Sequence, residues 1–157
     1  MTVLLVAGCA GEPSAESEPD SPAGPVVEPS TTRVLPGDIV TLRAIDVPGV
    51  GAVVADRQNN TLYRNEKDTT NPPKSTCLEP ECTLVWPPLL AAKVETDGVD
   101  ATLVGLMERP DGTKQVTLNG RPLYRYVDDE NPGDAVGNGV DGVWFAVAPS
   151  GEKARAR

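Results

Sequence analysis

The feature that most constrains this chain is an internal repetition. The tripeptide Leu-Tyr-Arg occurs twice, and in both copies an Asp stands five places after the Tyr, at Asp68 and Asp129. The two tyrosines, Tyr63 and Tyr124, lie roughly 60 positions apart, which is the length of a structural repeat. The spacing therefore predicts that the chain is a duplication of one unit.

Each copy continues in the same order, through a loop to a Trp, which is Trp86 in the first copy and Trp144 in the second. We expect the Tyr and the Trp of each copy to bury a large aromatic area, with the Tyr hydroxyl bonded locally to the Asp that ends its own strand. Two such copies can pack about a pseudo-twofold axis, so that neither leaves an open sheet edge.

Strand and turn signals fill the rest of the domain. β-branched or alternating runs predict strands at residues 38–47, 51–56, 100–108, 113–118, 121–127 and 142–149. Asn119-Gly120 predicts a two-residue hairpin in which Leu118 pairs with Arg121 and Val116 with Leu123. Pro122 favours the beginning of a strand or an edge position.

Helical patterns are weak by comparison. No stretch beyond the N-terminus repeats its apolar residues with a period of 3.6 over three turns. The sequence therefore predicts an all-β or β-dominated fold, a compact antiparallel domain built from two internal repeats and preceded by a disordered tether. The predicted parts are residues 1–9, 10–33, 34–151 and a basic tail at 152–157.

The charge balance and the missing histidines exclude several classes of function. The formal net charge is −9, which argues against a nucleic-acid partner because phosphate binding needs a basic surface. The chain contains no histidine, so it can build neither a Ser-His-Asp or Cys-His site nor a C-x-x-C-H haem attachment. We therefore expect a protein that is not an enzyme, and we predict no cofactor.

Three cysteines divide into a pair and a single residue. Cys77 and Cys82 frame a short loop, and an exported domain in an oxidising compartment would close that loop as a disulfide. Two reduced thiols, a redox pair and a metal clip are the alternatives. No second ligand pair lies nearby in the sequence, which makes the metal clip the weakest of them.

The third cysteine, Cys9, ends the apolar segment "TVLLVAGC". This segment resembles the lipobox of bacterial lipoproteins, in which the cysteine becomes the lipid-modified first residue of the mature protein. Eight residues are too few to span a bilayer and lack a positively charged start, so we expect a truncated or misplaced beginning. The alternative is an ordinary apolar N-terminus with a chance cysteine.

The residues after Cys9 have the composition of a tether. Residues 10–32 hold five acidic residues, five prolines and no Lys or Arg. Such a segment cannot bury enough apolar surface to offset its chain entropy. We therefore predict an extracytoplasmic protein, lipid-anchored to the bacterial cell membrane or envelope. Its expected partners are the membrane, through the anchor, and an unknown envelope protein or small ligand.

Tyr124, Tyr126 and Asp129 form a Tyr-x-aromatic-x-x-Asp motif, and the first copy departs from it because Asn65 takes the aromatic position. The cysteine pair ahead of "WPPL" and the segment "NPGDAVGNGVDGVWFAVAPSG" accompany the motif. In these features the chain resembles the bacterial secreted-repeat lipoproteins of unknown function. The resemblance covers roughly residues 51–151 and implies a two-repeat envelope lipoprotein without an assigned activity.

An acidic, glycine-rich loop is the first candidate for chemistry. Asp134, Asn138 and Asp141, with the acidic residues that precede them, could offer oxygen ligands to Ca²⁺. The loop lacks the spacing of an EF-hand, and Asx turns in a solvated loop explain the same residues. We therefore regard it as a weak metal candidate and favour the solvated loop.

Two further alternatives concern catalysis and redox chemistry. Asp68 and Asp129, if the duplication brought them together, would be the natural carboxylate pair of a glycan-active enzyme. A redox protein would use the cysteine pair or hold haem or copper, for which Met107 is the one thioether ligand left beyond the lipobox. The bulk of the pattern favours a β-rich binding or structural module displayed on the envelope.

Overall fold

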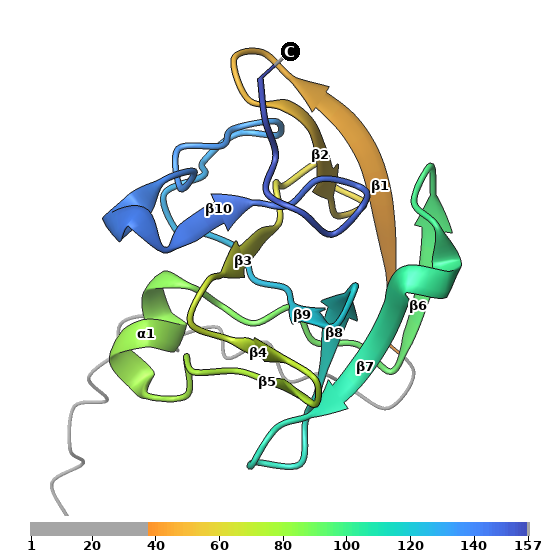
Figure 1. Ribbon diagram of the computed structural model, residues 1–157, viewed down its shortest axis with the longest axis vertical. Coiled ribbons are helices and arrows are strands. Elements are labelled where there is room, and N and C mark those ends of the chain that lie inside the picture. The colour runs from red at the N-terminus through yellow and green to blue at the C-terminus, as the bar shows by residue number, and fades with distance from the viewer. Residues whose placement is uncertain (1–37, 157) are drawn as a thin grey trace, which may run out of the picture. The chain divides into compact units, whose positions relative to one another are not determined.

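The computed structural model describes residues 38–156 (Figure 1). The predicted lipidation site Cys9, the signal at 1–9 and the tether at 10–33 lie outside these described residues. Ten strands, one short α-helix and two 3-10 helices make up the described part. The predicted all-β class is confirmed, because strands carry the fold and the only α-helix among residues 38–156 spans six residues.

The first sheet has the order β2-β1-β6 (Figure 1). Strands β1 (Ile39–Val47) and β2 (Gly51–Ala55) form an antiparallel hairpin, as the sequence predicts. Strand β6 (Lys93–Asp97) adds to the other side of β1 and runs parallel to it. This is the one parallel pairing among the named strands, so the domain is not antiparallel throughout.

The second three-stranded sheet has the order β7-β8-β9 and contains the predicted Asn-Gly hairpin. Its strands are β7 (Val104–Glu108), β8 (Lys114–Leu118) and β9 (Arg121–Pro122). Leu118 pairs with Arg121, and the Leu123 N–H donates to the Val116 carbonyl at 2.9 Å, as predicted. Pro122 lies in the outer strand of the sheet, where its missing N–H is harmless.

Smaller elements complete the domain. Strand β3 (Tyr63–Asn65) pairs with β10 (Trp144–Ala146), and β4 (Thr69–Thr70) pairs with β5 (Pro73–Lys74). Helix α1 (Pro80–Val85) and the 3-10 helices Ala101–Leu103 and Val140–Gly142 lie in the connections.

Three predicted strands are shorter than expected, and the one expected at 142–149 is limited to β10 (Trp144–Ala146). The strand expected at 100–108 begins at Val104, because the Asp100 carboxylate accepts the Thr102 N–H and starts a 3-10 turn. The strand expected at 121–127 ends at Pro122. Beyond it, Tyr124 forms isolated bridges to Tyr63 and Pro88 instead of extending the hairpin.

Backbone hydrogen bonds relate the two halves by a pseudo-twofold axis. The first repeat runs from the β1–β2 hairpin to Leu89, and the second from the β7–β8 hairpin to Val147. Tyr63 and Tyr124 lie on the axis, where each N–H donates to the carbonyl of the other at 2.9 and 3.0 Å. On either side of this pair the same ring of three residues recurs, made by Val54, Leu62 and Val147 on one side and by Val116, Leu123 and Leu89 on the other.

These rings show that the repeats exchange their last segments. Val147, from the second repeat, bonds to Val54 and Leu62 of the first. Leu89, from the first repeat, bonds to Val116 and Leu123 of the second. Neither repeat therefore completes its own backbone pairing, and the two must fold together.

The core has two apolar clusters. Aliphatic residues from both repeats form one of them, with Leu42, Leu62, Leu89 and Leu123 fully buried. The other gathers around the aromatic side chains of the repeat motif. Residues 152–156, the predicted basic tail, lie against this domain: the Ala154 N–H donates to the Ala146 carbonyl, and Ala154 is buried.

Candidate functional site

The motif tyrosines bond to the aspartates of the opposite repeat. The Tyr63 hydroxyl donates to Asp129 Oδ2 at 2.6 Å, and the Tyr124 hydroxyl donates to Asp68 Oδ2 at 2.6 Å. The sequence-based expectation of a local bond within each copy is therefore wrong. Because the two tyrosines lie side by side on the axis, each hydroxyl reaches across it to the other repeat.

Both aspartates also hold a loop of their own repeat. Asp68 Oδ1 accepts the Thr76 N–H at 2.7 Å, and Asp129 Oδ1 accepts the Val136 N–H at 3.0 Å. Burial raises the pKa of both carboxyl groups, against the opposing effect of these hydrogen bonds. Burial and the adjacent carboxylate also raise the pKa of Tyr63 and Tyr124, so both phenols stay protonated as donors.

The aromatic rings form a continuous stack through the axis. Trp86 and Trp144 lie parallel, with centroids 4.0 Å apart, and each meets the tyrosine of its own repeat edge-on. Tyr126 stacks on Trp86 at 4.2 Å, whereas Asn65 takes its place in the first repeat. Gly137 makes room for both rings, because a Cβ there would fall 3.0 Å from the Tyr126 ring and 2.9 Å from Trp86.

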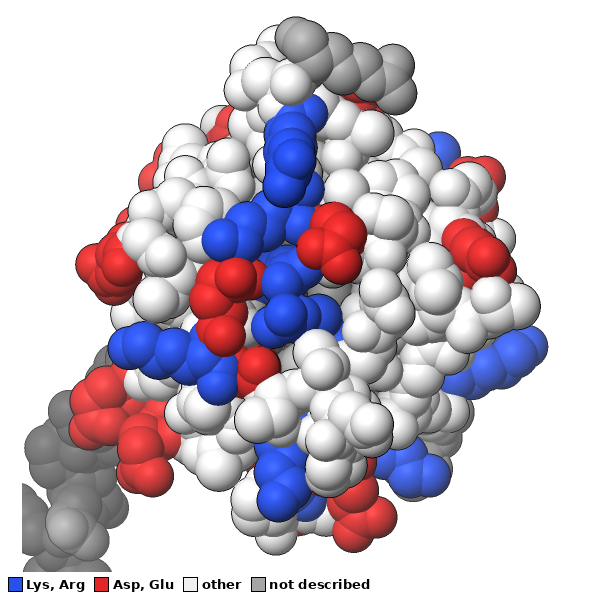
Figure 2. All heavy atoms as spheres, in the orientation of Figure 1, with Lys and Arg blue, Asp and Glu red and all other residues white. Residues whose placement is uncertain are grey.

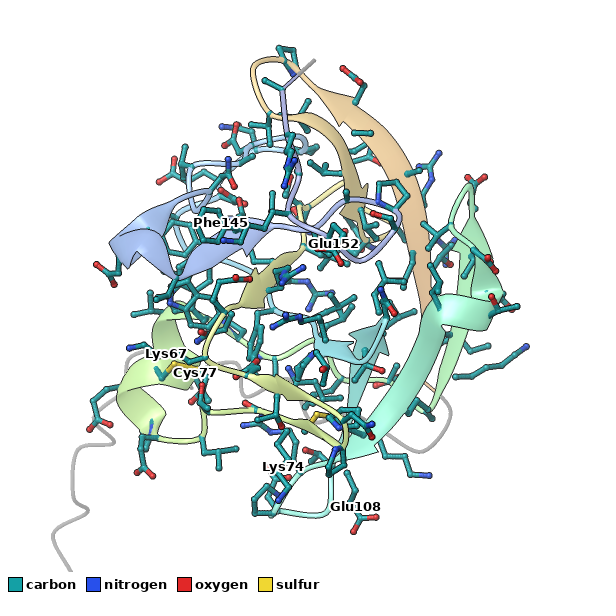
Figure 3. The ribbon with its side chains drawn as sticks, viewed as in Figure 1. Lys67, Lys74, Cys77, Glu108, Phe145 and Glu152 are labelled. Atoms are coloured by element: carbon teal, nitrogen blue, oxygen red, sulfur yellow. A yellow bond between two sulfur atoms is a disulfide. The ribbon has the colours of Figure 1, made fainter. Side chains whose placement is uncertain are left out.

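The Arg of each Leu-Tyr-Arg also bonds far from its own position in the chain. Arg64 Nη1 donates to the Gly151 carbonyl, beyond the end of the second repeat, at 2.7 Å, and Arg125 Nε pairs with Asp56 Oδ2 of the first repeat at 2.9 Å. Arg64 further joins a mixed network of ion pairs with Glu66 and Glu152, and basic and acidic side chains interleave on this face (Figure 2; Glu152 is labelled in Figure 3). The repeated tripeptide thus ties the two halves together.

The predicted disulfide is confirmed. Cys77 and Cys82 are bonded, which joins β5 and its loop to helix α1 (Figure 3). Cys77 is buried beside Trp86, whose carbonyl lies 3.9 Å from the Cys77 sulfur. The bond therefore closes the edge of the aromatic cluster.

The acidic loop uses its oxygen atoms internally. The Asp134 carboxylate accepts the Asn131 N–H at 2.8 Å, and Asn138 Oδ1 accepts the Ala146 N–H at 3.0 Å. Asp141 has a left-handed backbone conformation. Within residues 38–156, no group of three or more His, Cys, Asp or Glu side chains could hold a metal ion.

Asp68 and Asp129, the candidate carboxylate pair, are each bonded to a different tyrosine and a different loop. This arrangement accounts for the repeated Asp without a catalytic role. Met107 is buried beside a surface pocket. Both cysteines of the head are in the disulfide, so the described residues offer that pocket one sulfur ligand at most.

The two repeats differ at three equivalent positions, which are apolar in the aromatic cluster and polar near the end of β7. Ala44 pairs with Val54 as Leu106 pairs with Val116, so Val47 corresponds to Arg109 and Val53 to Gln115. The residue before the loop amide held by each Asp is Ala135 in one repeat and Ser75 in the other. Val47, Val53 and Ala135 pack in the aromatic cluster, whereas Ser75, Arg109 and Gln115 are buried polar residues.

Ser75, Arg109 and Gln115 are joined by hydrogen bonds, and we call them the polar triad. Arg109 Nη1 donates to Gln115 Oε1 at 2.7 Å and to Ser75 Oγ at 3.4 Å, and Nη2 donates to the Cys77 carbonyl at 3.1 Å. Gln115 Nε2 donates to the Leu123 carbonyl at 2.9 Å. Ser75 Oγ lies 2.7 Å from the Tyr124 hydroxyl, which links the triad to Asp68.

Two members of the polar triad, Ser75 and Arg109, line a pocket of about 400 Å³. Its lining residues are Lys74, Ser75, Leu78, Met107, Glu108, Arg109 and Pro110. Lys74, from β5, and Glu108, at the end of β7, lie at the same end of the domain (Figure 3). We call this the Arg109 pocket.

The equivalent position in the first repeat also carries a pocket, but its lining differs. Its pocket is lined by Asp46, Val47, Gly49, Gly51 and Ala156. The end of the chain lies close against it, because a Cβ at Gly51 would collide with the Arg155 carbonyl oxygen. One repeat therefore has a valine and a carboxylate in its pocket where the other has a buried guanidinium.

Sequence reasoning missed this site. Arg109 stands directly before Pro110-Asp111-Gly112, where it looks like an ordinary turn residue. The usable signal was the alignment of "VPG" at 47–49 with "RPD" at 109–111, which places a charged residue opposite a valine.

Comparisons with known proteins identify the repeat. A family described as a secreted repeat of unknown function matches residues 45–90 and again residues 105–148. Searches of curated proteins and of solved structures each found no match. In the part of the chain that the structure describes, no helix has the length and hydropathy needed to cross a membrane.

Proposed function

The chain belongs to the family of secreted repeats of unknown function, and we propose that it is a lipid-anchored envelope protein whose head is a ligand-binding module. The binding site in this proposal is the Arg109 pocket. The Tyr, Asp and Trp residues of the repeat motif hold the two halves together and are not themselves the site.

The observation that carries the binding proposal is the broken pseudo-symmetry. The fold tolerates Val47, Val53 and Ala135 at the positions that Arg109, Gln115 and Ser75 occupy in the other repeat. Burying a guanidinium and an amide costs free energy unless both are well bonded, and an apolar replacement of such a group is often neutral or stabilising. A polar group that the fold does not need points to a role in binding.

The anchoring proposal rests on the segment that ends at Cys9 and on the acidic, proline-rich residues after it. The Cys77–Cys82 disulfide is consistent with an oxidising, extracytoplasmic compartment. One diacyl anchor with an amide-linked chain holds a protein on a membrane more firmly than a single acyl chain does.

Anchoring is tested by expressing the full chain behind a complete lipoprotein leader and supplying a clickable fatty acid. We expect label on the parent, with partition into the membrane fraction, and neither on Cys9→Ser. Equal labelling of Cys9→Ser would refute lipidation at this residue.

Binding is tested with a variant that copies the first repeat, Ser75→Ala/Arg109→Val/Gln115→Val, which we call the apolar variant. A ligand-observed NMR screen of small molecules is run against the full parent chain and the apolar variant. We expect compounds that bind the parent and not the variant, while the variant stays folded. If every compound that binds does so equally to both proteins, the Arg109 pocket is not the binding site.

A further inference from the structure

We infer that the Arg109 pocket binds a carboxylate that carries a small apolar group. This inference rests on the proposed function, because it names the ligand of the same site. It follows from a buried guanidinium with free N–H groups, a net positive lining and an apolar wall, which meet in one open pocket.

The guanidinium of Arg109 is almost fully buried, with 6% of the residue exposed, yet its bonds are incomplete. A guanidinium has five N–H groups, and acceptors among residues 38–156 bind three of them. The two left over are Nε–H and one N–H of Nη2. These two nitrogens form the fork with which arginine binds a carboxylate through two parallel hydrogen bonds.

The partners of Arg109 are all neutral. Its acceptors are a serine hydroxyl, a glutamine amide and a backbone carbonyl, and no ion pair among the described residues includes it. The anion nearest along the hydrogen bonds is Asp68, which is reached only through the hydroxyls of Ser75 and Tyr124. Hydrogen bonds from Thr113, and after them the charge of Arg109, lower the pKa of Asp111, so this carboxylate lies near the guanidinium without forming an ion pair with it. The guanidinium therefore has no direct anionic partner among residues 38–156.

The lining favours a single negative charge. Lys74 and Arg109 supply two cations and Glu108 one anion, whereas the equivalent pocket of the first repeat has only Asp46. A phosphate dianion would meet Glu108 without the cluster of backbone N–H groups that phosphate sites use. A monocarboxylate matches both the fork and the charge.

The rest of the wall is apolar. Leu78, Met107 and Pro110 line the pocket, and Leu78 is 41% exposed. Covering the exposed Leu78 side chain is favourable for a ligand with a hydrocarbon group next to its carboxylate. The chemistry fits a small branched or linear organic acid, or the C-terminal residue of a peptide.

The probe that tests this inference is N-acetyl-leucine, with its methyl ester and inorganic phosphate as comparisons. The measurement is a ¹H–¹⁵N NMR titration of the full, disulfide-bonded chain that follows the Nε–H signal of Arg109. A probe of this size should bind with a dissociation constant of about 1 mM. We expect the ester and phosphate to bind at least about tenfold more weakly, because neither matches the fork and the charge together.

Three variants separate binding from folding. Arg109→Lys keeps the charge and removes the fork, so affinity should fall about tenfold or more. Lys74→Gln changes an exposed residue and should weaken binding about two- to fivefold. The matched control is Asp46→Asn in the equivalent hairpin, which should leave the affinity unchanged. Amide signals of residues 46–51 report whether any shift spreads beyond the pocket.

The outcomes are distinct. If the ester or phosphate binds at Arg109 as well as the acid does, the ligand class is wrong while the pocket remains a binding site. If no probe or screened compound shifts the pocket signals, both proposals fail. A tripeptide that ends in leucine and binds at least tenfold more tightly than its C-terminal amide and than N-acetyl-leucine identifies a peptide C-terminus as the source. Equal affinity of the tripeptide and N-acetyl-leucine identifies a small acid.

Discussion

Because each tyrosine hydroxyl bonds to the Asp of the opposite repeat, this arrangement and a local one predict different effects of removing a hydroxyl. Replacing Tyr124 by Phe removes the hydroxyl that donates to Asp68 and lies 2.7 Å from Ser75, while the ring contact with Trp144 remains. Because this bond crosses the axis, the substitution should remove a donor from Asp68 in the first repeat. Asp129, five residues along the same chain, should not respond.

The structure sets the expected size of the effect. A hydrogen bond to a charged group contributes about 1.5–3 kcal/mol to the free energy of unfolding. Asp68 is 5% exposed, so losing a donor leaves a buried carboxylate short of a partner, and the cost should be about 3 kcal/mol. Tyr63→Phe should cost less, about 1.5 kcal/mol, because Asp129 is only half-buried.

The assay is a pair of double-mutant cycles measured by urea unfolding of the disulfide-bonded chain. Tyr124→Phe with Asp68→Asn should show a coupling free energy of about 1.5–3 kcal/mol. Tyr124→Phe with Asp129→Asn should be additive within about 0.5 kcal/mol. Strong coupling of Tyr124 to Asp129, with none to Asp68, would refute the exchanged arrangement and restore the local one.

The disulfide and the buried carboxylate give two further predictions. Replacing Cys77 and Cys82 by Ser opens the short loop between them and should cost about 2 kcal/mol of unfolding free energy in urea, while an unchanged midpoint would mean that the loop is ordered without the bond. Burial raises the pKa of Asp68, so the folded state holds its proton more tightly than the unfolded state does. The parent should therefore gain stability relative to Asp68→Asn as the pH falls from that raised value towards the ordinary value of about 3.9, and urea unfolding of both proteins that shows a pH-independent difference would contradict this.

The local parts of the fold could be predicted from the sequence. The Asn-Gly turn gave the correct register at Leu118 and Arg121, because a two-residue loop fixes which residues face each other. Strand β6 was missed because "KVETD" carries three charges and leaves only Val94 and Thr96 half-buried, which is a weak alternation. Helix α1 was missed because its six residues are too few for a periodic pattern, and a proline and the disulfide hold it in place.

The exchange between repeats could not be predicted from spacing. Each Tyr can satisfy its hydroxyl with either Asp, and both arrangements use the same four residues. Only the placement of Tyr63 and Tyr124 against each other on the axis decides which carboxylate each reaches. The sequence therefore predicts which residues form the hydrogen bonds, but it does not predict which Tyr bonds to which Asp.

In a duplicated fold, residues at equivalent positions of the two repeats can be compared to find which of them folding requires. Where both repeats keep the same residue, as with the Leu, Tyr, Asp and Trp of the motif, the shared contact is enough to explain it. Where the repeats differ, the structure shows whether the different side chain is accommodated by contacts within the core. Tyr126 in place of Asn65 is accommodated, because it stacks on Trp86 in space that Gly137 leaves open.

Arg109 in place of Val47 is not accommodated in this way. Its charge meets only neutral acceptors, two of its N–H groups have no acceptor among residues 38–156, and the cavity beside it stays open. Arg109 therefore costs burial energy, gains three hydrogen bonds and leaves two N–H groups for the ligand that we propose. The same comparison makes the apolar variant the matched reagent for the binding test. The domain already folds with these residues at the equivalent positions, and the urea unfolding midpoint of the variant shows whether the Arg109 pocket tolerates them too.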